Sequence, residues 1–226
     1  MSEGPFINGK KNTKKGYRFL LSLNEEQKIA KSKIIESDVS VILGKAGSGK
    51  TLLACQIALQ MLLEKHVNKI VITRPTISQE DIGFLPGNLA DKMGPWVAPI
   101  YSNMYQLLRR ERVDKMIHDD QIEIVPVSYM RGRTFTNSAI IVDECQNLEH
   151  NQTLMILQRI GINSRMMFCG DTDQIDLKRT HDTGLDFLSR MDVNRLEVIK
   201  LMENHRHPIL EDIMTAYSES RHNSSF

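Results

Sequence analysis

A glycine-rich run between an apolar stretch and a helical pattern constrains this chain most. The run is Gly44-Lys45-Ala46-Gly47-Ser48-Gly49-Lys50-Thr51, which fits the pattern G-x-x-x-x-G-K-[ST]. Val39–Leu43 precedes it and has the composition of a buried strand, and residues 51–64 follow with the apolar period of a helix. Glycine lets backbone N–H groups turn inward around an anion, and a helix N-terminus adds further donors. The run therefore predicts a phosphate-binding loop between a strand and a helix.

Strands and helices alternate along the rest of the chain. Apolar runs predict strands at residues 39–43, 69–73, 122–127, 139–142, 166–169 and 196–201, and helical patterns fall at 24–35, 51–64, 151–160, 182–190 and 208–217. Residues 78–118 are predicted to be helical in several pieces, broken at Pro86-Gly87 and at Gly94-Pro95. Strands that are apolar throughout are typical of a parallel sheet buried on both faces. The pattern predicts an α/β chain with one doubly wound, mostly parallel sheet and helices on both faces.

The composition is that of an ordinary globular chain. The 226 residues include 29 Lys+Arg and 28 Asp+Glu, which leaves a formal net charge of +1, and 41% of the residues are hydrophobic. These values argue against a largely disordered chain and against a strongly basic polyanion binder, but they allow local basic patches. Residues 1–18 are lysine-rich and predict a flexible basic arm. Residues 19–217 form the predicted domain, and residues 218–226 a loose tail.

The sequence predicts a cytoplasmic protein without a membrane segment. Its polar N-terminus lacks the apolar core of a secretory signal, and no run of about 18 apolar residues occurs. Cys55, Cys145 and Cys169 each lie in an apolar run, without the spacing of a zinc site. We therefore expect three buried thiols in a reducing compartment rather than a disulfide framework.

Two acids follow the fourth predicted strand. Asp143 and Glu144 come directly after Ile140-Ile141-Val142. A phosphate-binding loop of this type uses a carboxylate at the end of a neighbouring strand, together with the loop hydroxyl, to hold Mg²⁺. Asp143 and Thr51 are therefore the predicted Mg²⁺ ligands, and Lys50 is the predicted contact to the β- and γ-phosphates of ATP. Glu144 suits the base that orients an attacking water.

A second polar segment follows the fifth predicted strand. Phe168-Cys169 ends the strand, and a polar loop from Gly170 to Gln174 follows it. The carboxyl ends of strands are where α/β sheets place their ligands. Gln174 is thus predicted to sense the γ-phosphate and the attacking water, with an ordinary polar loop residue as the alternative.

Several motifs together give the chain a resemblance to the PhoH family. They are the glycine-rich run at 44–51, Thr73-Arg74-Pro75-Thr76, Gly83-Phe84-Leu85-Pro86-Gly87, Tyr129-Met130-Arg131-Gly132-Arg133-Thr134-Phe135, Val142-Asp143-Glu144-Cys145-Gln146-Asn147 and Gly170-Asp171-Thr172-Asp173-Gln174-Ile175-Asp176. The resemblance covers about residues 20 to 217. It implies a RecA-like P-loop ATPase domain related to the first motor domain of superfamily 1 helicases. Cys145 and Asp173 depart from the family pattern, at positions outside the expected chemistry.

The resemblance implies roles for further residues. Gln27 resembles the residue that reads adenine in helicase-like ATPases, with a capping or surface Gln as the alternative. Thr73 and Arg74 match a motif that touches the nucleic-acid backbone, although Arg74 could instead pair with a nearby acid. Arg131 and Arg133 are expected to reach nucleic acid or a neighbouring subunit, or else to be solvated loop arginines.

The resemblance also implies an incomplete ATP site. Superfamily 1 helicases bind ATP between two motor domains, and this sequence has room for one. Arg206, in Asn204-His205-Arg206-His207, is therefore expected to act as an arginine finger in cis or across a subunit interface, with a helix-capping role as the alternative. A ring, expected to be a homohexamer, would bring each ATP site against a neighbouring subunit.

Three functions remain open from the sequence. The first is an ATPase with a helicase-like motor function, coupled to RNA or single-stranded DNA. The second is a P-loop kinase for a small molecule, whose lid would use the cluster Arg109, Arg110, Arg112 and Lys115. The third is a nucleotide-binding assembly module without catalysis. Because all the catalytic residue types are present, we rank the ATPase first.

Overall fold

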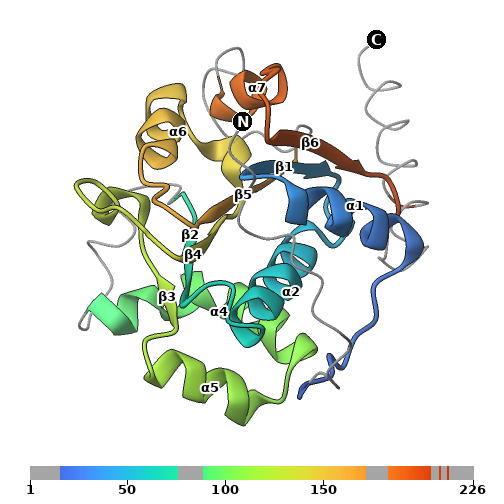
Figure 1. Cartoon of the computed structure of the whole chain (residues 1–226), viewed down its shortest axis with the longest axis vertical. Coiled ribbons are helices and arrows are strands. Elements are labelled where there is room, and N and C mark those ends of the chain that lie inside the picture. Colours follow the sequence, from blue (N-terminus) through green and yellow to red (C-terminus); the bar gives the residue numbers. More distant parts are fainter. Residues whose placement is uncertain (1–15, 76–88, 172–182, 205–208, 210–212, 214–226) are drawn as a thin grey trace.

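A single six-stranded sheet organises the chain. The computed structural model describes residues 16–75, 89–171 and 183–204, together with Ile209 and Ile213. The strands are β1 (Val39–Gly44), β2 (Lys69–Thr73), β3 (Ile122–Ile124), β4 (Ser138–Val142), β5 (Arg165–Gly170) and β6 (Leu196–Leu201), in the order β3-β2-β4-β5-β1-β6 (Figure 1). All five pairings between neighbours are parallel. The prediction of a single parallel α/β sheet is confirmed.

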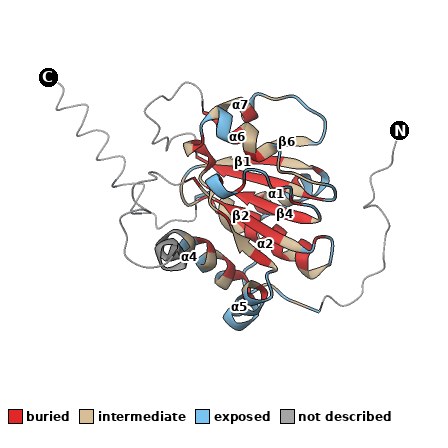
Figure 2. Ribbon diagram, turned by 90° about the vertical axis from the view of Figure 1, so that its left-hand side faces the viewer, coloured by how far each residue is buried: buried red, intermediate tan, exposed pale blue. Residues whose placement is uncertain are grey.

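Helices cover both faces of the sheet. On one face lie α1 (Glu25–Glu36), α2 (Lys50–Leu63), α4 (Leu89–Leu107) and α5 (Arg110–His118), and on the other lie α6 (His150–Leu157) and α7 (Gly184–Ser189). Each face of the sheet has its own hydrophobic core, and alternate residues of each central strand point into one core or the other. Ile141 packs with the first set of helices, and Ile140 and Val142 pack with the second. This alternation explains why the middle positions of the central strands are mostly apolar and buried (Figure 2).

The predicted helix break at Gly94-Pro95 is wrong. Helix α4 runs without interruption from Leu89 to Leu107 and so passes through Gly94, Pro95 and Pro99. A proline in a helix removes one backbone hydrogen bond and costs about 3 kcal/mol. Burial of Ile100, Met104 and Leu107 against the sheet-facing core offsets this cost. The other predicted break, Pro86-Gly87, and most of the predicted helix at 208–217 lie outside the described residues.

One further difference lies at an edge strand of the sheet, β3. The third strand ends at Ile124 rather than at residue 127, because Val127–Tyr129 forms a 3₁₀ turn, η1. A second 3₁₀ turn, η2, covers Cys145–Asn147, directly after Asp143 and Glu144.

Within the described residues, no helix combines the length and the apolar character needed to cross a membrane.

The topology gathers the carboxyl ends of three central strands. Strands β4, β5 and β1 are neighbours in the sheet and run in the same direction, so the chain segments that follow them meet at one edge. These segments contain Asp143-Glu144, Asp171 and the glycine-rich run. The sheet thus brings together residues that are far apart in the sequence, at the edge where α/β folds bind ligands.

Candidate nucleotide-binding site

The glycine-rich run forms a tight loop between β1 and α2. Gly47 and Gly49 have φ angles of 93° and 80°, in the left-handed region that favours glycine. Gly44 is also packed closely, since a Cβ atom there would lie 2.5 Å from Ser48 Oγ and 2.7 Å from the Leu201 carbonyl oxygen. A side chain would be strained at Gly47 and Gly49 and would clash with its neighbours at Gly44. The glycines of the motif are therefore required by the loop geometry itself.

Two side chains of the loop have polar groups suited to phosphate. Lys50 Nζ donates to the carbonyl oxygens of Gly44 and Lys45, at 2.6 and 3.0 Å, which holds the ammonium group over the loop. Ser48 is 2% exposed, and its Oγ has no hydrogen-bond partner among the described residues. An unpaired buried hydroxyl costs free energy unless a ligand satisfies it. The loop thus fits the phosphate groups of a nucleotide.

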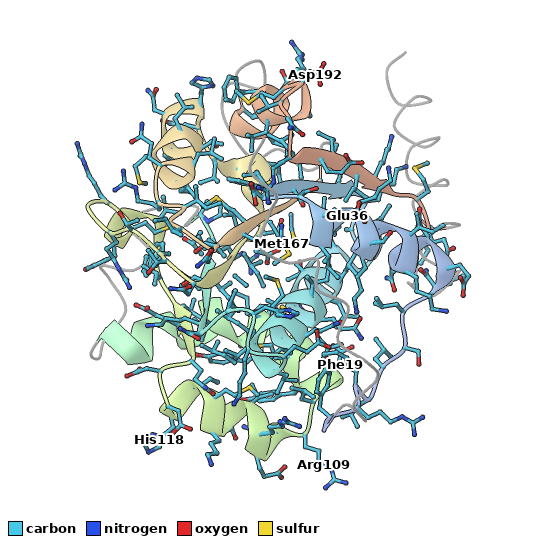
Figure 3. The ribbon with its side chains drawn as sticks, viewed as in Figure 1. Phe19, Glu36, Arg109, His118, Met167 and Asp192 are labelled. Atoms are coloured by element: carbon cyan, nitrogen blue, oxygen red, sulfur yellow. The ribbon has the colours of Figure 1, made fainter. Side chains whose placement is uncertain are left out.

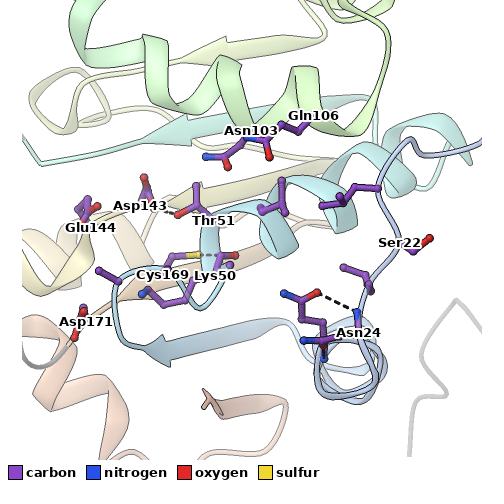
Figure 4. A pocket seen from close by; sticks show the side chains of 17 residues that line it. Ser22, Asn24, Lys50, Thr51, Asn103, Gln106, Asp143, Glu144, Cys169 and Asp171 are labelled. Atoms are coloured by element: carbon purple, nitrogen blue, oxygen red, sulfur yellow. Dashed lines mark hydrogen bonds between the residues drawn. The ribbon is translucent and has the colours of Figure 1, made fainter. Parts of the chain in front are cut away.

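The predicted Mg²⁺ ligands lie in contact with each other. Thr51 Oγ1 donates to Asp143 Oδ1 at 2.6 Å, between the first turn of α2 and the end of β4 (Figure 4). Asp143 is 5% exposed, and burial raises the pKa of its carboxyl group, opposed by the hydrogen bond from Thr51. Mg²⁺ prefers one or two carboxylate or hydroxyl oxygens, with phosphate and water oxygens completing its coordination. This pair fits such an ion.

Glu144 adopts a left-handed backbone conformation, with φ 51° and ψ 38°. In an extended strand, consecutive side chains point to opposite faces. The left-handed turn at Glu144 ends the strand and lets Asp143 and Glu144 line the same cavity. Such a conformation costs about 1–3 kcal/mol in a non-glycine residue and is typical of functional positions. The strain is consistent with the predicted catalytic role of Glu144.

Two neighbours hold the Glu144 carboxylate. Gln146 Nε2 donates to Glu144 Oε2 at 2.6 Å, and Arg74 Nη2 lies 3.7 Å from Glu144 Oε1. Gln146 Oε1 in turn accepts a hydrogen bond from the Asp171 backbone N–H at 3.1 Å. Gln146 is 1% exposed and so bridges the end of β4 to the end of β5. The sequence showed Gln146 only as one letter of a motif, and no spacing rule indicated this bridge.

Replacing Gln146 with Met should lower kcat for nucleotide hydrolysis about tenfold with little change in KM. Met has a similar shape but removes both hydrogen bonds, so Glu144 loses its orientation and the buried Asp171 N–H loses its partner, at a stability cost of about 1–3 kcal/mol. Steady-state kinetics with thermal unfolding checks this. The control is Gln158→Met, because Gln158 is exposed at the end of α6. An equal loss of kcat in both variants would contradict the positioning role.

A cavity of about 760 Å³ joins these groups. Its phosphate end holds Lys50, Thr51, Asp143 and Glu144, and Asp171 also lines it (Figure 4). Residues 21–24 and Gln27 line it on the α1 side, and Asn103 and Gln106 of α4 add two amide side chains. This volume lies within the range of about 300–1,000 Å³ found for ligand pockets. No arginine of the described residues lines this cavity.

Gln27 serves the cap of α1 and lies at the cavity. Asn24 Oδ1 accepts from the Gln27 N–H at 2.7 Å, and Gln27 Oε1 accepts from the Asn24 N–H at 3.3 Å, which forms a capping box and confirms the capping alternative for Gln27. Gln27 is also a lining residue, as adenine contact requires. The two interpretations of Gln27 are therefore compatible.

The predicted nucleic-acid residues have different environments. Thr73 is fully buried, and its Oγ1 has no partner among the described residues, so the hydroxyl does not face a surface that a strand could touch. Arg133 forms two hydrogen bonds to the Glu123 carboxylate, each 2.9 Å long, and covers the Phe135 ring, which favours a structural role. Arg74 is paired with Glu144, and Arg131 is exposed. Gln174 and Arg206 lie outside the described residues.

The cysteines are buried as expected. Cys55, Cys145 and Cys169 are free thiols, and burial raises the pKa of each, which keeps them protonated. No cluster of three or more His, Cys, Asp or Glu side chains suited to a metal ion occurs within the described ranges.

Comparisons with known proteins agree with the geometry. Residues 20–218 match the family model described as "PhoH-like protein". The chain is 37% identical over 196 residues to the PhoH-like protein of Synechocystis sp., covering 84% of this chain and 60% of that relative. It is 37% identical over 182 residues to Protein PhoH of Escherichia coli, covering 78% of this chain and 51% of that relative. The chain thus spans about half to three fifths of the length of these curated relatives.

A solved structure shares the fold. The large terminase from a thermophilic bacteriophage superposes with a TM-score of 0.55 at 9% identity, covering 86% of this chain and 50% of that chain. At this identity the likeness shows the fold alone. With the family match over nearly the whole chain and the phosphate-binding loop at the expected edge of the sheet, the chain belongs to the PhoH family and has the nucleotide-binding P-loop NTPase fold.

Proposed function

We propose that this chain binds ATP with Mg²⁺ in the 760 Å³ cavity and hydrolyses it, coupled to binding and remodelling of RNA or single-stranded DNA. The observation that carries the proposal is that one cavity combines the phosphate-binding loop, the Thr51–Asp143 pair and Glu144. These are the groups that phosphoryl transfer to water requires. They come from two parts of the sequence that are about 90 residues apart, so their convergence is a property of the fold.

Each residue has a defined task in this proposal. The loop N–H groups and Lys50 bind the β- and γ-phosphates, and the Lys50 ammonium exchanges the carbonyls of Gly44 and Lys45 for phosphate oxygens. Thr51 and Asp143 would hold Mg²⁺, which neutralises charge on the phosphates when it is bound. Glu144, aimed by Gln146, accepts the proton of the attacking water.

Arg74 supports coupling to a nucleic-acid strand. Its guanidinium lies just beyond the end of β2 and 3.7 Å from the Glu144 carboxylate. A strand phosphate at this edge would compete for the same guanidinium, and Glu144 would then gain freedom to engage water. Arg74 thus offers a physical route by which a bound strand changes the rate of hydrolysis.

A neighbouring subunit would complete the site. Phosphoryl transfer builds negative charge that a cation stabilises, and among the described residues no arginine lines the cavity. We therefore propose that Arg206, acting in cis or from the next subunit of a hexameric ring, supplies that charge.

The kinase alternative is less favoured, because Arg109 and Arg112 of its expected lid line a different cavity.

Replacing Lys50 with Ala tests the assignment. We expect free phosphate release by the wild type, faster with RNA or single-stranded DNA, and a loss of about 10²–10³-fold in Lys50→Ala, as is typical when one preorganised donor is removed. Lys28→Ala is the matched control, because Lys28 is exposed and pairs with Glu25 at the surface. Full turnover by Lys50→Ala, or phosphorylation of an acceptor in place of free phosphate, would overturn the proposal. The native mass of the protein, measured with Mg²⁺-ATP present, tests the proposed hexameric ring.

A further inference from the structure

A second cavity lies beside the nucleotide cavity and shares no lining residue with it. It has a volume of about 550 Å³ and is formed by residues 16–20 together with Leu108, Arg109 and Arg112. Residues 16–20 therefore line this cavity, and the next four residues of the chain, 21–24, line the nucleotide cavity. The Leu20 N–H donates to the Leu107 carbonyl at 2.9 Å and fixes the segment against the end of α4.

The second cavity is strongly positive. Arg18, Arg109 and Arg112 line it, and no Asp or Glu of the described residues does. None of these three arginines forms an ion pair with a carboxylate in the described part of the chain. The neighbouring Arg110, in contrast, pairs with Asp114 at 3.7 Å and covers the Tyr105 ring. Three guanidinium groups around one cavity, without a carboxylate partner in the described ranges, attract an anion, and their planar forks suit phosphate oxygens.

Aromatic rings form another part of its wall. Tyr17 and Phe19 meet edge to face, with ring centroids 5.4 Å apart. The Tyr17 hydroxyl donates to Glu64 Oε1 at 2.6 Å, which anchors the ring, and Glu64 itself does not line the cavity. Figure 3 shows Phe19 and Arg109 on the same side of the molecule, on the N-terminal segment and at the start of α5. Proteins that bind single-stranded nucleic acids combine aromatic rings, on which bases stack, with positively charged side chains, which contact the phosphates.

We propose that this cavity is a binding site for the phosphodiester backbone of single-stranded RNA or DNA. Arg18, Arg109 and Arg112 hold the phosphates, and the rings of Tyr17 and Phe19 contact a base. Three arginines around one cavity favour a ligand with several phosphates over a single free phosphate ion. The proposal rests on the nucleic-acid part of the proposed function but uses none of the ATP-site residues.

The site would couple the strand to the nucleotide through one short segment. Residues 16–20 contact the strand and residues 21–24 line the nucleotide cavity, so ordering of one half restrains the other. The Gln56 side chain donates to the Leu21 carbonyl at 3.1 Å, between the two halves. Strand binding would therefore raise ATP affinity, and by thermodynamic reciprocity ATP would raise strand affinity by the same factor.

The test measures binding without nucleotide by fluorescence anisotropy. The probes are labelled oligouridylate and oligothymidylate of about 12 nucleotides, a length within known site sizes, at about 50 to 200 mM salt. The variant Arg18→Ala/Arg109→Ala/Arg112→Ala should bind the oligonucleotides about 10–100-fold more weakly than the wild type. The slope of log K against log salt concentration should fall in magnitude by about 2, because each phosphate contact to a single strand contributes about 0.7. The control Arg110→Ala/Arg190→Ala removes two exposed arginines that do not line the cavity, and should change affinity less than about twofold.

Three outcomes decide between the proposals. If the triple variant keeps wild-type affinity and slope while the wild type binds strands, this site is wrong and the proposed function stands. If inorganic pyrophosphate displaces the strand at equal phosphate concentration, the cavity is a site for free phosphates and the strand assignment is overturned. Lys50→Ala should keep full strand affinity, because the ATP site is not involved; a parallel loss would also overturn the proposal. Circular dichroism and unchanged ATP affinity confirm that the triple variant is folded.

Discussion

Glu144→Gln should slow ATP hydrolysis by roughly 10²–10⁴-fold, the usual range for a general base, while nucleotide affinity stays within a few-fold of the wild type. The amide fills the same space as the carboxylate but cannot take a proton from water. Lys50, Thr51 and Asp143 remain in place, so the phosphates and Mg²⁺ keep their contacts. Phosphate release under saturating ATP, with binding of a fluorescent ATP analogue, measures the two effects separately.

Two further variants sharpen this prediction. Glu144→Asp keeps the charge but shortens the side chain by one methylene, which draws the carboxylate away from Gln146 Nε2, so we expect an intermediate rate. Glu36→Gln is the matched control, because Glu36 is exposed at the end of α1, and it should retain the wild-type rate. If Glu144→Gln turns over ATP as fast as Glu36→Gln, the attacking water is activated by another group.

The fold was largely predictable because its pattern is local. Strands buried on both faces leave uninterrupted apolar runs, and all six predicted strands are present. The helix break predicted at Gly94-Pro95 failed because local propensity was overridden by packing: α4 buries Ile100, Met104 and Leu107. No single-sequence rule weighs a proline against a tertiary contact that the sequence does not show.

The candidate site was predictable only where a motif fixes geometry. The contact between Thr51 and Asp143, 92 residues apart, followed from the known pairing of a phosphate-binding loop with a strand-end carboxylate. The Gln146 bridge and the second cavity did not follow, because both depend on how separate segments approach one another. Arg109 and Arg112 gave a visible charge cluster, but their partner Arg18 lies about 90 residues earlier and is brought to them by the Leu20–Leu107 hydrogen bond.

Asp143→Asn should strongly reduce ATP turnover and yet stabilise the fold. Removal of the Mg²⁺-binding charge should cost about 10²–10³-fold in rate. The stabilising effect arises because Asp143 is almost fully buried, and burial raises the pKa of its carboxyl group. The Asn side-chain oxygen still accepts the hydrogen bond from Thr51 Oγ1, and no charge has to be desolvated. Without Mg²⁺ or ATP at neutral pH, we expect a higher Tm, with about 2–4 °C for each kcal/mol gained in a chain of this length.

The pH dependence provides the strongest check on this second prediction. Because the pKa of Asp143 is raised in the folded state, the folded chain binds more protons than the unfolded chain between about pH 3.9, the ordinary value, and the raised value. The free energy of unfolding of the wild type therefore falls as pH rises through this window, and the full cost is present above it. The Tm advantage of Asp143→Asn should thus be largest at neutral pH and vanish below about pH 4, where Asp143 is protonated in both states.

The control Asp192→Asn alters an exposed carboxylate and should show no such change. A lower Tm for Asp143→Asn at neutral pH would mean that the hydrogen bond of the carboxylate with Thr51 and its electrostatic attraction to Arg74 outweigh its desolvation.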